Sequence, residues 1–129
     1  MPKGSPKPAP LRGDAAPPVP ASAGAHVRAQ VACMQAGDFA GAFGRNSPAN
    51  RARLGDAQQF EAIVQGNASF AALAQPGNRC EFGEEESIAA GRFAVRVRAH
   101  TVQETYSFVF DVCETKEGDF ATDGVRIEC

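Results

Sequence analysis

The chain has 129 residues, of which 43% are hydrophobic and 22% charged, and its formal net charge at neutral pH is −2. This length suits a single domain, and the mildly acidic balance argues against a nucleic-acid-binding protein, which would carry a basic footprint. The apolar runs are far shorter than the ~20 residues that a membrane-spanning helix needs, so we expect a soluble protein, of the cytoplasm or a plastid.

Residues 1–25 differ in composition from the rest of the chain, because seven prolines stand there among Ala, Ser and Gly. Such a stretch buries too little surface to offset its ordering entropy, and it lacks the apolar middle of a secretory signal peptide. We predict a disordered Pro/Ala-rich leader or linker, with a transit peptide as the alternative. Residues 26–129 are predicted to form a single domain.

A run of short helices is predicted after the leader, because glycines and capping residues divide this part of the chain. The first helix has apolar residues at helical spacing: Val27, Val31 and Met34. Gly37 ends this helix, and Asp38 caps a second one, in which Phe39 and Phe43 lie on one face.

Two further helices start at clear capping signals. Ser47 is a cap, and Pro48 follows at the first helical position of the third helix. Asp56 opens the fourth helix, with Gln59 three residues later as its capping-box partner. The buried stripe of the fourth helix is predicted to be Phe60, Ile63 and Val64. A last helical turn is expected around Ser69–Leu73.

The second half of the chain alternates with period two, which predicts antiparallel strands. In the first clear strand, one face is apolar (Phe93, Val95, Val97, Ala99) and the other is basic (Arg92, Arg96, Arg98). In the next strand, one face carries Tyr106, Phe108, Phe110 and Val112. A hairpin turn at residues 116–119 then leads to the last strand.

Two features of the predicted sheet depart from simple alternation. In the last strand, Phe120 and Thr122 are out of phase with Val125 and Ile127, so we predict a β-bulge at Asp123-Gly124. A weaker strand is predicted around residues 80–88, where three glutamates interrupt the apolar pattern. We expect it at an edge of the sheet, with its acidic residues facing the arginines.

Together these elements predict an α+β fold, with N-terminal helices packed on a curved antiparallel sheet of three or four strands. The order of elements resembles the nuclear transport factor 2-like, or cystatin-like, superfamily, in which a bent sheet and a long helix form a cone. Within it, the chain resembles a family known as a domain of unknown function. The resemblance spans residues 26–127 and rests on five motifs: Val27-Arg28-Ala29-Gln30, Gly37-Asp38-Phe39-Ala40, Ser47-Pro48-Ala49-Asn50-Arg51, Phe60 and Thr122-Asp123-Gly124-Val125. It implies a fold and no activity.

Few residues suggest chemistry. The four cysteines have no C-x-x-C spacing, so we expect free thiols, with a Cys80–Cys113 disulfide as the alternative, and no metal or cofactor. His26 lies beside the leader and His100 at a predicted strand end, where exposed histidines are common. Three aspartates have sufficient structural explanations: Asp38 and Asp56 as helix caps, and Asp123 as the bulge residue.

The aromatic residues predict an apolar interior that suits binding better than catalysis. The candidate pocket residues are Phe39, Phe43, Phe60, Tyr106, Phe108 and Phe110. The first hypothesis is a non-catalytic domain that binds a small apolar ligand in the cone, or that binds a protein or a second copy through the sheet. Binding of a ligand in the cone requires a cavity well above ~100 Å³. The alternative is an isomerase-, dehydratase- or cyclase-type enzyme in which Tyr106 would act as the acid or oxyanion donor. Under the first hypothesis there is no catalytic residue.

Overall fold

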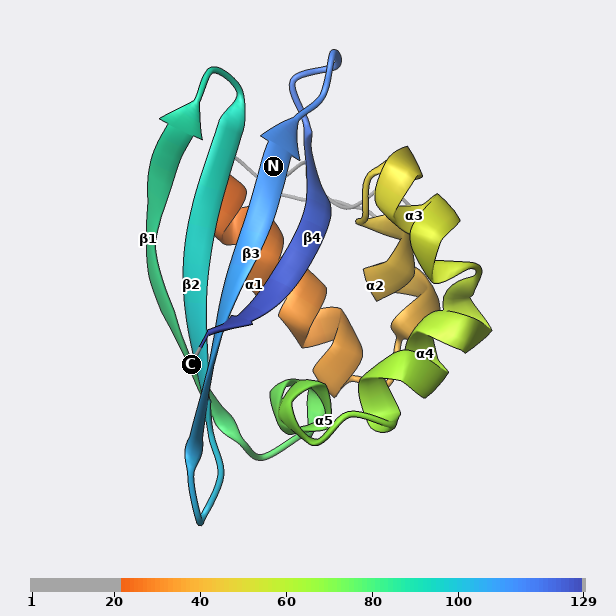
Figure 1. Ribbon diagram of the computed structural model, residues 1–129, viewed down its shortest axis with the longest axis vertical. Helices are drawn as coiled ribbons and strands as arrows, with labels where there is room; N and C mark the ends of the chain where they lie inside the picture. Colours follow the sequence, from red (N-terminus) through yellow and green to blue (C-terminus); the bar gives the residue numbers. More distant parts are fainter. Residues whose placement is uncertain (1–21, 129) are drawn as a thin grey trace, which may run out of the picture.

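The fold is an α+β arrangement in which five helices pack against a curved, four-stranded antiparallel sheet (Figure 1). The computed structural model describes residues 22–128. The predicted fold class is therefore confirmed, whereas residues 1–21 of the predicted leader lie outside the described residues. Helix α1 (Ala23–Gln35) begins inside the segment predicted as leader, because the Ser22 side chain accepts a hydrogen bond from the Ala25 N–H and caps the helix.

Helix α1 is the central helix and contacts all four strands. Its buried residues follow helical spacing: Ala23, His26, Val27, Gln30, Val31 and Met34. The predicted apolar stripe is thus confirmed, but two polar residues, His26 and Gln30, are buried within it.

The other helices are short and stand where the capping signals and the expected turn around Ser69–Leu73 predict them. They are α2 (Phe39–Gly44), α3 (Pro48–Leu54), α4 (Ala57–Gln65) and α5 (Ala68–Ala74). Asp38 caps α2, Ser47 caps α3, and the Asp56–Gln59 capping box opens α4. In α4, Phe60 and Val64 are buried as predicted, but Ile63 is 46% exposed. None of the helices within residues 22–128 has the length and hydropathy to cross a membrane.

The sheet is a simple meander of β1 (Arg79–Ala89), β2 (Arg92–His100), β3 (Thr105–Glu114) and β4 (Phe120–Glu128), in that spatial order. The β3–β4 turn contains Gly118 with φ of +82°, a conformation that glycine adopts without steric cost. The predicted glutamate-bearing segment is a full edge strand, β1, and Glu86 pairs with Arg96 of β2 at 3.0 Å, as the facing charges indicated.

Strand β4 contains the bulge that the phase conflict predicted. Thr122 pairs with Val112 and Gly124 pairs with Asp111, so Asp123 is the extra residue. Because of this insertion, Thr122 and Val125 both face the helices, and Asp123 is free to turn toward α3. The bulge therefore joins the sheet to the helical layer.

The two faces of the sheet differ. The face toward the helices carries Phe108, Phe110 and Val112, all buried in the core, with Tyr106 at its margin. On the opposite face, Val109 is also buried, and its neighbours across the sheet are Arg96 and Arg126.

Candidate functional site

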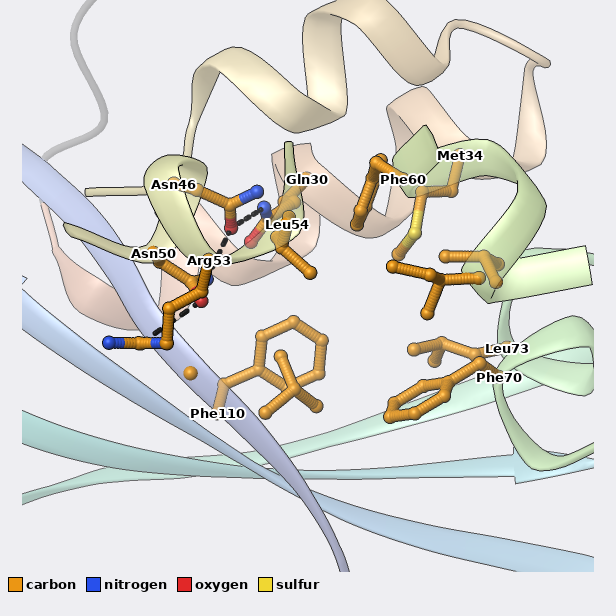
Figure 2. Close-up of a pocket in the computed structure, with 14 residues that line it drawn as sticks. Gln30, Met34, Asn46, Asn50, Arg53, Leu54, Phe60, Phe70, Leu73 and Phe110 are labelled. Carbon is orange, nitrogen blue, oxygen red and sulfur yellow. Dashed lines mark hydrogen bonds between the residues drawn. The ribbon is translucent and has the colours of Figure 1, made fainter. Parts of the chain in front are cut away.

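A pocket of about 300 Å³ lies between the helices and strands β3 and β4 (Figure 2). Most of its wall is apolar: Met34, Leu54, Phe60, Ile63, Val64, Phe70, Leu73, Phe110 and Val125. Four polar side chains, Gln30, Asn46, Asn50 and Arg53, also line it, and Figure 2 shows them together at one end. The pocket therefore has an apolar end and an amide end.

The apolar end is built from aromatic packing between helices and sheet. Phe70 of α5 stacks on Phe108 of β3, with ring centroids 5.6 Å apart. Phe60 of α4 is held from behind by Phe39 at 6.2 Å and Phe43 at 5.9 Å. These contacts fix two of the three rings that line the pocket, Phe60 and Phe70, the third being Phe110.

The amide end is built from side-chain hydrogen bonds that connect α1, α3 and Asn46, which precedes the α3 cap residue Ser47. Gln30 Nε2 donates to the Ala42 carbonyl at 2.9 Å and to Asn46 Oδ1 at 3.0 Å. Asn50 Nδ2 donates to Asn46 Oδ1 at 3.2 Å and to the Thr122 carbonyl at 3.4 Å. Because both backbone carbonyls can only accept, they fix the orientation of the Gln30 and Asn50 amides.

This orientation also fixes the tautomer of a buried histidine. With Gln30 Nε2 facing a carbonyl, Gln30 Oε1 must accept the hydrogen bond from the Thr122 hydroxyl. The Thr122 hydroxyl then accepts from His26, so the proton of the neutral imidazole lies on Nε2, 2.9 Å from Thr122 Oγ1. The chain His26–Thr122–Gln30–Asn46–Asn50 is hereafter the buried polar network.

His26 corrects the sequence-based expectation of an exposed histidine, because only 1% of it is exposed. Its pKa is lowered to about 4, first because burial penalises the imidazolium, and then because the Arg45 guanidinium repels it; the Asp119 carboxylate acts in the opposite direction. His26 is thus a neutral hydrogen-bond donor within the fold. A signal was present in the sequence, since His26 and Gln30 share the helical spacing of the apolar stripe.

Asn46 occupies a special place in this network. Its Oδ1 accepts from two amides, yet its Nδ2 is the one buried side-chain polar atom in residues 22–128 that has no hydrogen-bond partner. Its backbone is held by a parallel bridge to Thr122, flanked by the Ser47 N–H to Thr122 carbonyl bond of 2.8 Å. An unpartnered buried donor costs roughly 1–3 kcal/mol, so this position is tolerated rather than optimised.

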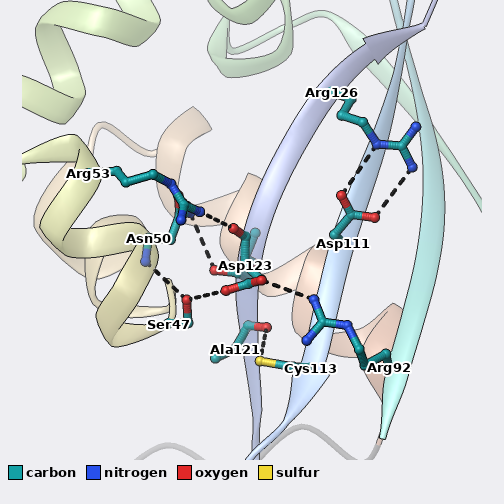
Figure 3. Close-up of polar contacts among 10 residues, drawn as sticks. Ser47, Asn50, Arg53, Arg92, Asp111, Cys113, Ala121, Asp123 and Arg126 are labelled. Atoms are coloured by element: carbon teal, nitrogen blue, oxygen red, sulfur yellow. Dashed lines mark hydrogen bonds and ion pairs between the residues drawn. The ribbon is translucent and has the colours of Figure 1, made fainter. Parts of the chain in front are cut away.

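The bulge residue Asp123 organises the rim of the amide end (Figure 3). Its carboxylate accepts from the Ser47 hydroxyl at 2.7 Å and pairs with Arg92 at 3.0 Å. These contacts, the Ser47 hydrogen bond first, hold the pKa of Asp123 below its usual range. Arg53 does not pair with that carboxylate: its Nη2 donates to the Asp123 main-chain carbonyl at 2.6 Å and to Asn50 Oδ1 at 3.1 Å.

The structure brings two of the six predicted pocket residues, Phe60 and Phe110, into the wall of the pocket. Phe39 and Phe43 pack behind Phe60, and Phe108 lies beneath Phe70. All five phenylalanines thus belong to one hydrophobic core.

Tyr106 lies outside the pocket wall. It is half-buried near the start of β3, opposite Ala99. Its pKa is raised, first because its phenol is partly withdrawn from water, and then through the nearby Glu104 carboxylate. The enzyme hypothesis required a tyrosine in the pocket, and this position does not supply one.

The remaining candidate residues have structural contacts. His100 ends β2 and hydrogen-bonds to Thr105 and Glu81, at 2.8 and 2.6 Å. Cys80 lies opposite Ala99 and Cys113 opposite Arg92, at opposite ends of the sheet with β2 between their strands, so they form no disulfide. Within residues 22–128, no group of three or more His, Cys, Asp or Glu side chains is placed to hold a metal ion.

A second depression, of about 320 Å³, lies beside Gly83 of β1. Of its charged lining residues, Arg96 pairs with Glu128 at 3.4 Å, and Glu81 pairs with Arg79, which lies outside the lining, at 3.3 Å. It lacks the apolar enclosure of the pocket between helices and sheet, which is therefore the stronger candidate site.

Comparison with protein-family models, curated proteins and solved structures gave no match to this chain. The resemblance to the nuclear transport factor 2-like superfamily accordingly stays a prediction from sequence motifs.

Proposed function

We propose that this domain is a non-catalytic module that binds a small, largely apolar ligand in the pocket between its helices and β3–β4. The observation that carries the proposal is an open space of about 300 Å³ walled by Phe60, Phe70 and Phe110. Protein interiors are close-packed, so a space of this size against large apolar side chains is a feature of binding sites.

The distribution of polar groups supports binding over catalysis. The buried polar network uses its donors and acceptors mostly within itself, and His26, its titratable member, is buried behind Thr122. General acid–base catalysis needs two titratable groups that converge on a substrate. The pocket wall contains one ionisable side chain, Arg53, and Tyr106 is not part of it.

The mouth of the pocket supplies a route for the ligand. Ile63 lines the pocket and is 46% exposed, although the other apolar residues on its face of α4 are buried. An apolar ligand that covers the exposed Ile63 side chain would remove apolar surface from water, and this burial favours binding.

The proposal is tested by NMR titration of the full-length chain with 1-octanol as an apolar probe. We expect backbone amide shifts that saturate and that concentrate at pocket residues such as Val64, Leu73 and Val125. Residues of the opposite sheet face, such as Arg98, should not shift. Absence of saturable shifts, or shifts spread over the opposite face, would refute the pocket as the binding site.

A matched pair of variants in β4 sharpens this test. Val125 lines the pocket, whereas Ile127, two residues further along the same face, does not and is 42% exposed. Val125→Phe should occupy the pocket and abolish the 1-octanol shifts, and Ile127→Phe should leave them unchanged. Equal behaviour of the two variants would contradict the proposal.

A further inference from the structure

We infer that the ligand of this pocket is an amphiphile with an anionic carboxylate head, which pairs with Arg53 while its apolar body lies among the aromatic residues. This inference rests on the proposed binding function and adds the chemical class of the ligand. It follows from the state of the four polar side chains at the amide end of the pocket.

Three of these side chains have little left to offer a ligand. Gln30 hydrogen-bonds through both its amide atoms, and Asn50 does the same. Asn46 Oδ1 already accepts two hydrogen bonds, and its unpartnered Nδ2 is sealed from solvent. The amides therefore shape the end of the pocket but do not supply an accessible recognition group.

Arg53 differs from them in charge and in accessibility. It is the one ionisable side chain in the pocket wall, and it is exposed on α3. Its two hydrogen bonds both come from Nη2, so Nε and Nη1 have no partner within residues 22–128. These free N–H groups are donors without a matching acceptor.

The neighbouring acid leaves the charge of Arg53 available. The Asp123 carboxylate is directed to the Ser47 hydroxyl and to Arg92, and Arg53 contacts only the main-chain carbonyl of Asp123. Two guanidinium groups thus flank one carboxylate, which leaves an excess of positive charge at this end of the pocket. Asp123 and Asn50 at the same time hold Arg53 in place, so little side-chain entropy is lost on binding.

The chemistry of the guanidinium selects the head group. Because Nη2 already donates to Asn50 and Asp123, Nη1 or Nε is the donor left for a carboxylate oxygen. Such a charge-assisted hydrogen bond is stronger than a neutral one. The rest of the wall, with Phe60, Phe70 and Leu73 at the far end, suits a hydrocarbon or aromatic body. A monocarboxylate with an apolar tail satisfies both ends at once (Figure 2).

The test compares two probes of equal chain length, octanoate and 1-octanol, by isothermal titration calorimetry on the full-length chain. We expect octanoate to bind about tenfold more tightly than 1-octanol, as a charge-assisted hydrogen bond implies. Arg53→Gln should lower the affinity for octanoate to about that for 1-octanol, and Arg53→Lys should keep part of the preference. Circular dichroism checks that each variant is folded.

Arg98→Gln is the matched control, because it removes the same charge from an exposed position on the opposite face of the sheet. It should keep the full preference for octanoate. Equal affinity of the two probes for the wild-type chain, or an equal loss in Arg53→Gln and Arg98→Gln, overturns the head-group inference and leaves the pocket intact. If neither probe binds, the proposed function itself fails.

Discussion

The apolar end of the pocket is held by packing, whereas the amide end is held by hydrogen bonds. At the apolar end, Phe70 and Phe108 stack. Replacing a side chain there by a smaller one costs stability that grows with the volume of the side-chain atoms removed. At the amide end, each side chain depends on the orientation of the next, from His26 through Gln30 to Asn50. The first end therefore contributes mainly stability, and the second fixes where α3 and the β4 bulge stand.

The largest effect is expected at the apolar end. Phe108→Ala removes a fully buried ring and the stacking partner of Phe70, which should lower the free energy of unfolding by about 4 kcal/mol. Urea denaturation followed by circular dichroism measures this loss. Phe108→Leu, which keeps most of the volume, should lose less than half as much; equal losses would show that the ring is not packed as described.

The next effect tests the amide end. Gln30→Leu leaves the Thr122 hydroxyl, the Ala42 carbonyl and Asn46 short of partners, so we expect a loss of about 3 kcal/mol. The control is Gln35→Leu on the same helix, where a half-buried amide donates to the Leu73 carbonyl at 3.2 Å. Its loss should stay near 1 kcal/mol. A Gln30 variant no less stable than the Gln35 variant would show that the network is not coupled.

The buried histidine predicts a pH dependence. Burial lowers the pKa of His26 to about 4 in the folded chain from its ordinary value of 6.5, so the unfolded chain binds the proton more readily between these values. Stability should therefore fall as pH decreases through this window, and His26 should account for about 2 kcal/mol between pH 7.5 and 5. Urea midpoints at the two pH values measure the change. His26→Gln keeps an N–H donor for Thr122 and should reduce the difference by that amount; an unchanged difference would contradict a neutral buried imidazole.

The smallest effect is expected on the sheet face that turns away from the pocket. Arg96 pairs there with Glu86 and Glu128, but all three side chains are substantially exposed. Exposed ion pairs contribute little, because water and salt screen them. Arg96→Gln should leave the denaturation midpoint within error at both low and high salt. A loss comparable to that of Gln30→Leu would mean that this face is more than a solvated surface.

The fold could be predicted from sequence because its signals are local. Asp38, Ser47 and Asp56 cap the helices as expected. The bulge at Asp123 follows from a change of phase that only an inserted residue can absorb. Such signals depend on neighbours in the chain, so they need no knowledge of the tertiary structure.

The apolar end of the pocket could be predicted only in part, and the amide end was missed. Aromatic residues identify an interior, but whether a ring faces a space, as Phe60 does, or packs behind it, as Phe39 does, depends on how the helices meet. Asn46 and Asn50 look like ordinary turn and helix-surface residues, because their partners lie on other elements. The polar positions within the α1 stripe were the available signal.

A crystal structure of the full-length chain grown with octanoate would decide whether the pocket is a ligand site. We expect the alkyl chain between Phe60, Phe70 and Leu73, with the carboxylate within hydrogen-bond distance of Arg53. An empty pocket at saturating octanoate, or the probe bound only on the opposite face of the sheet, would contradict the proposal that the space between helices and sheet serves to bind a ligand.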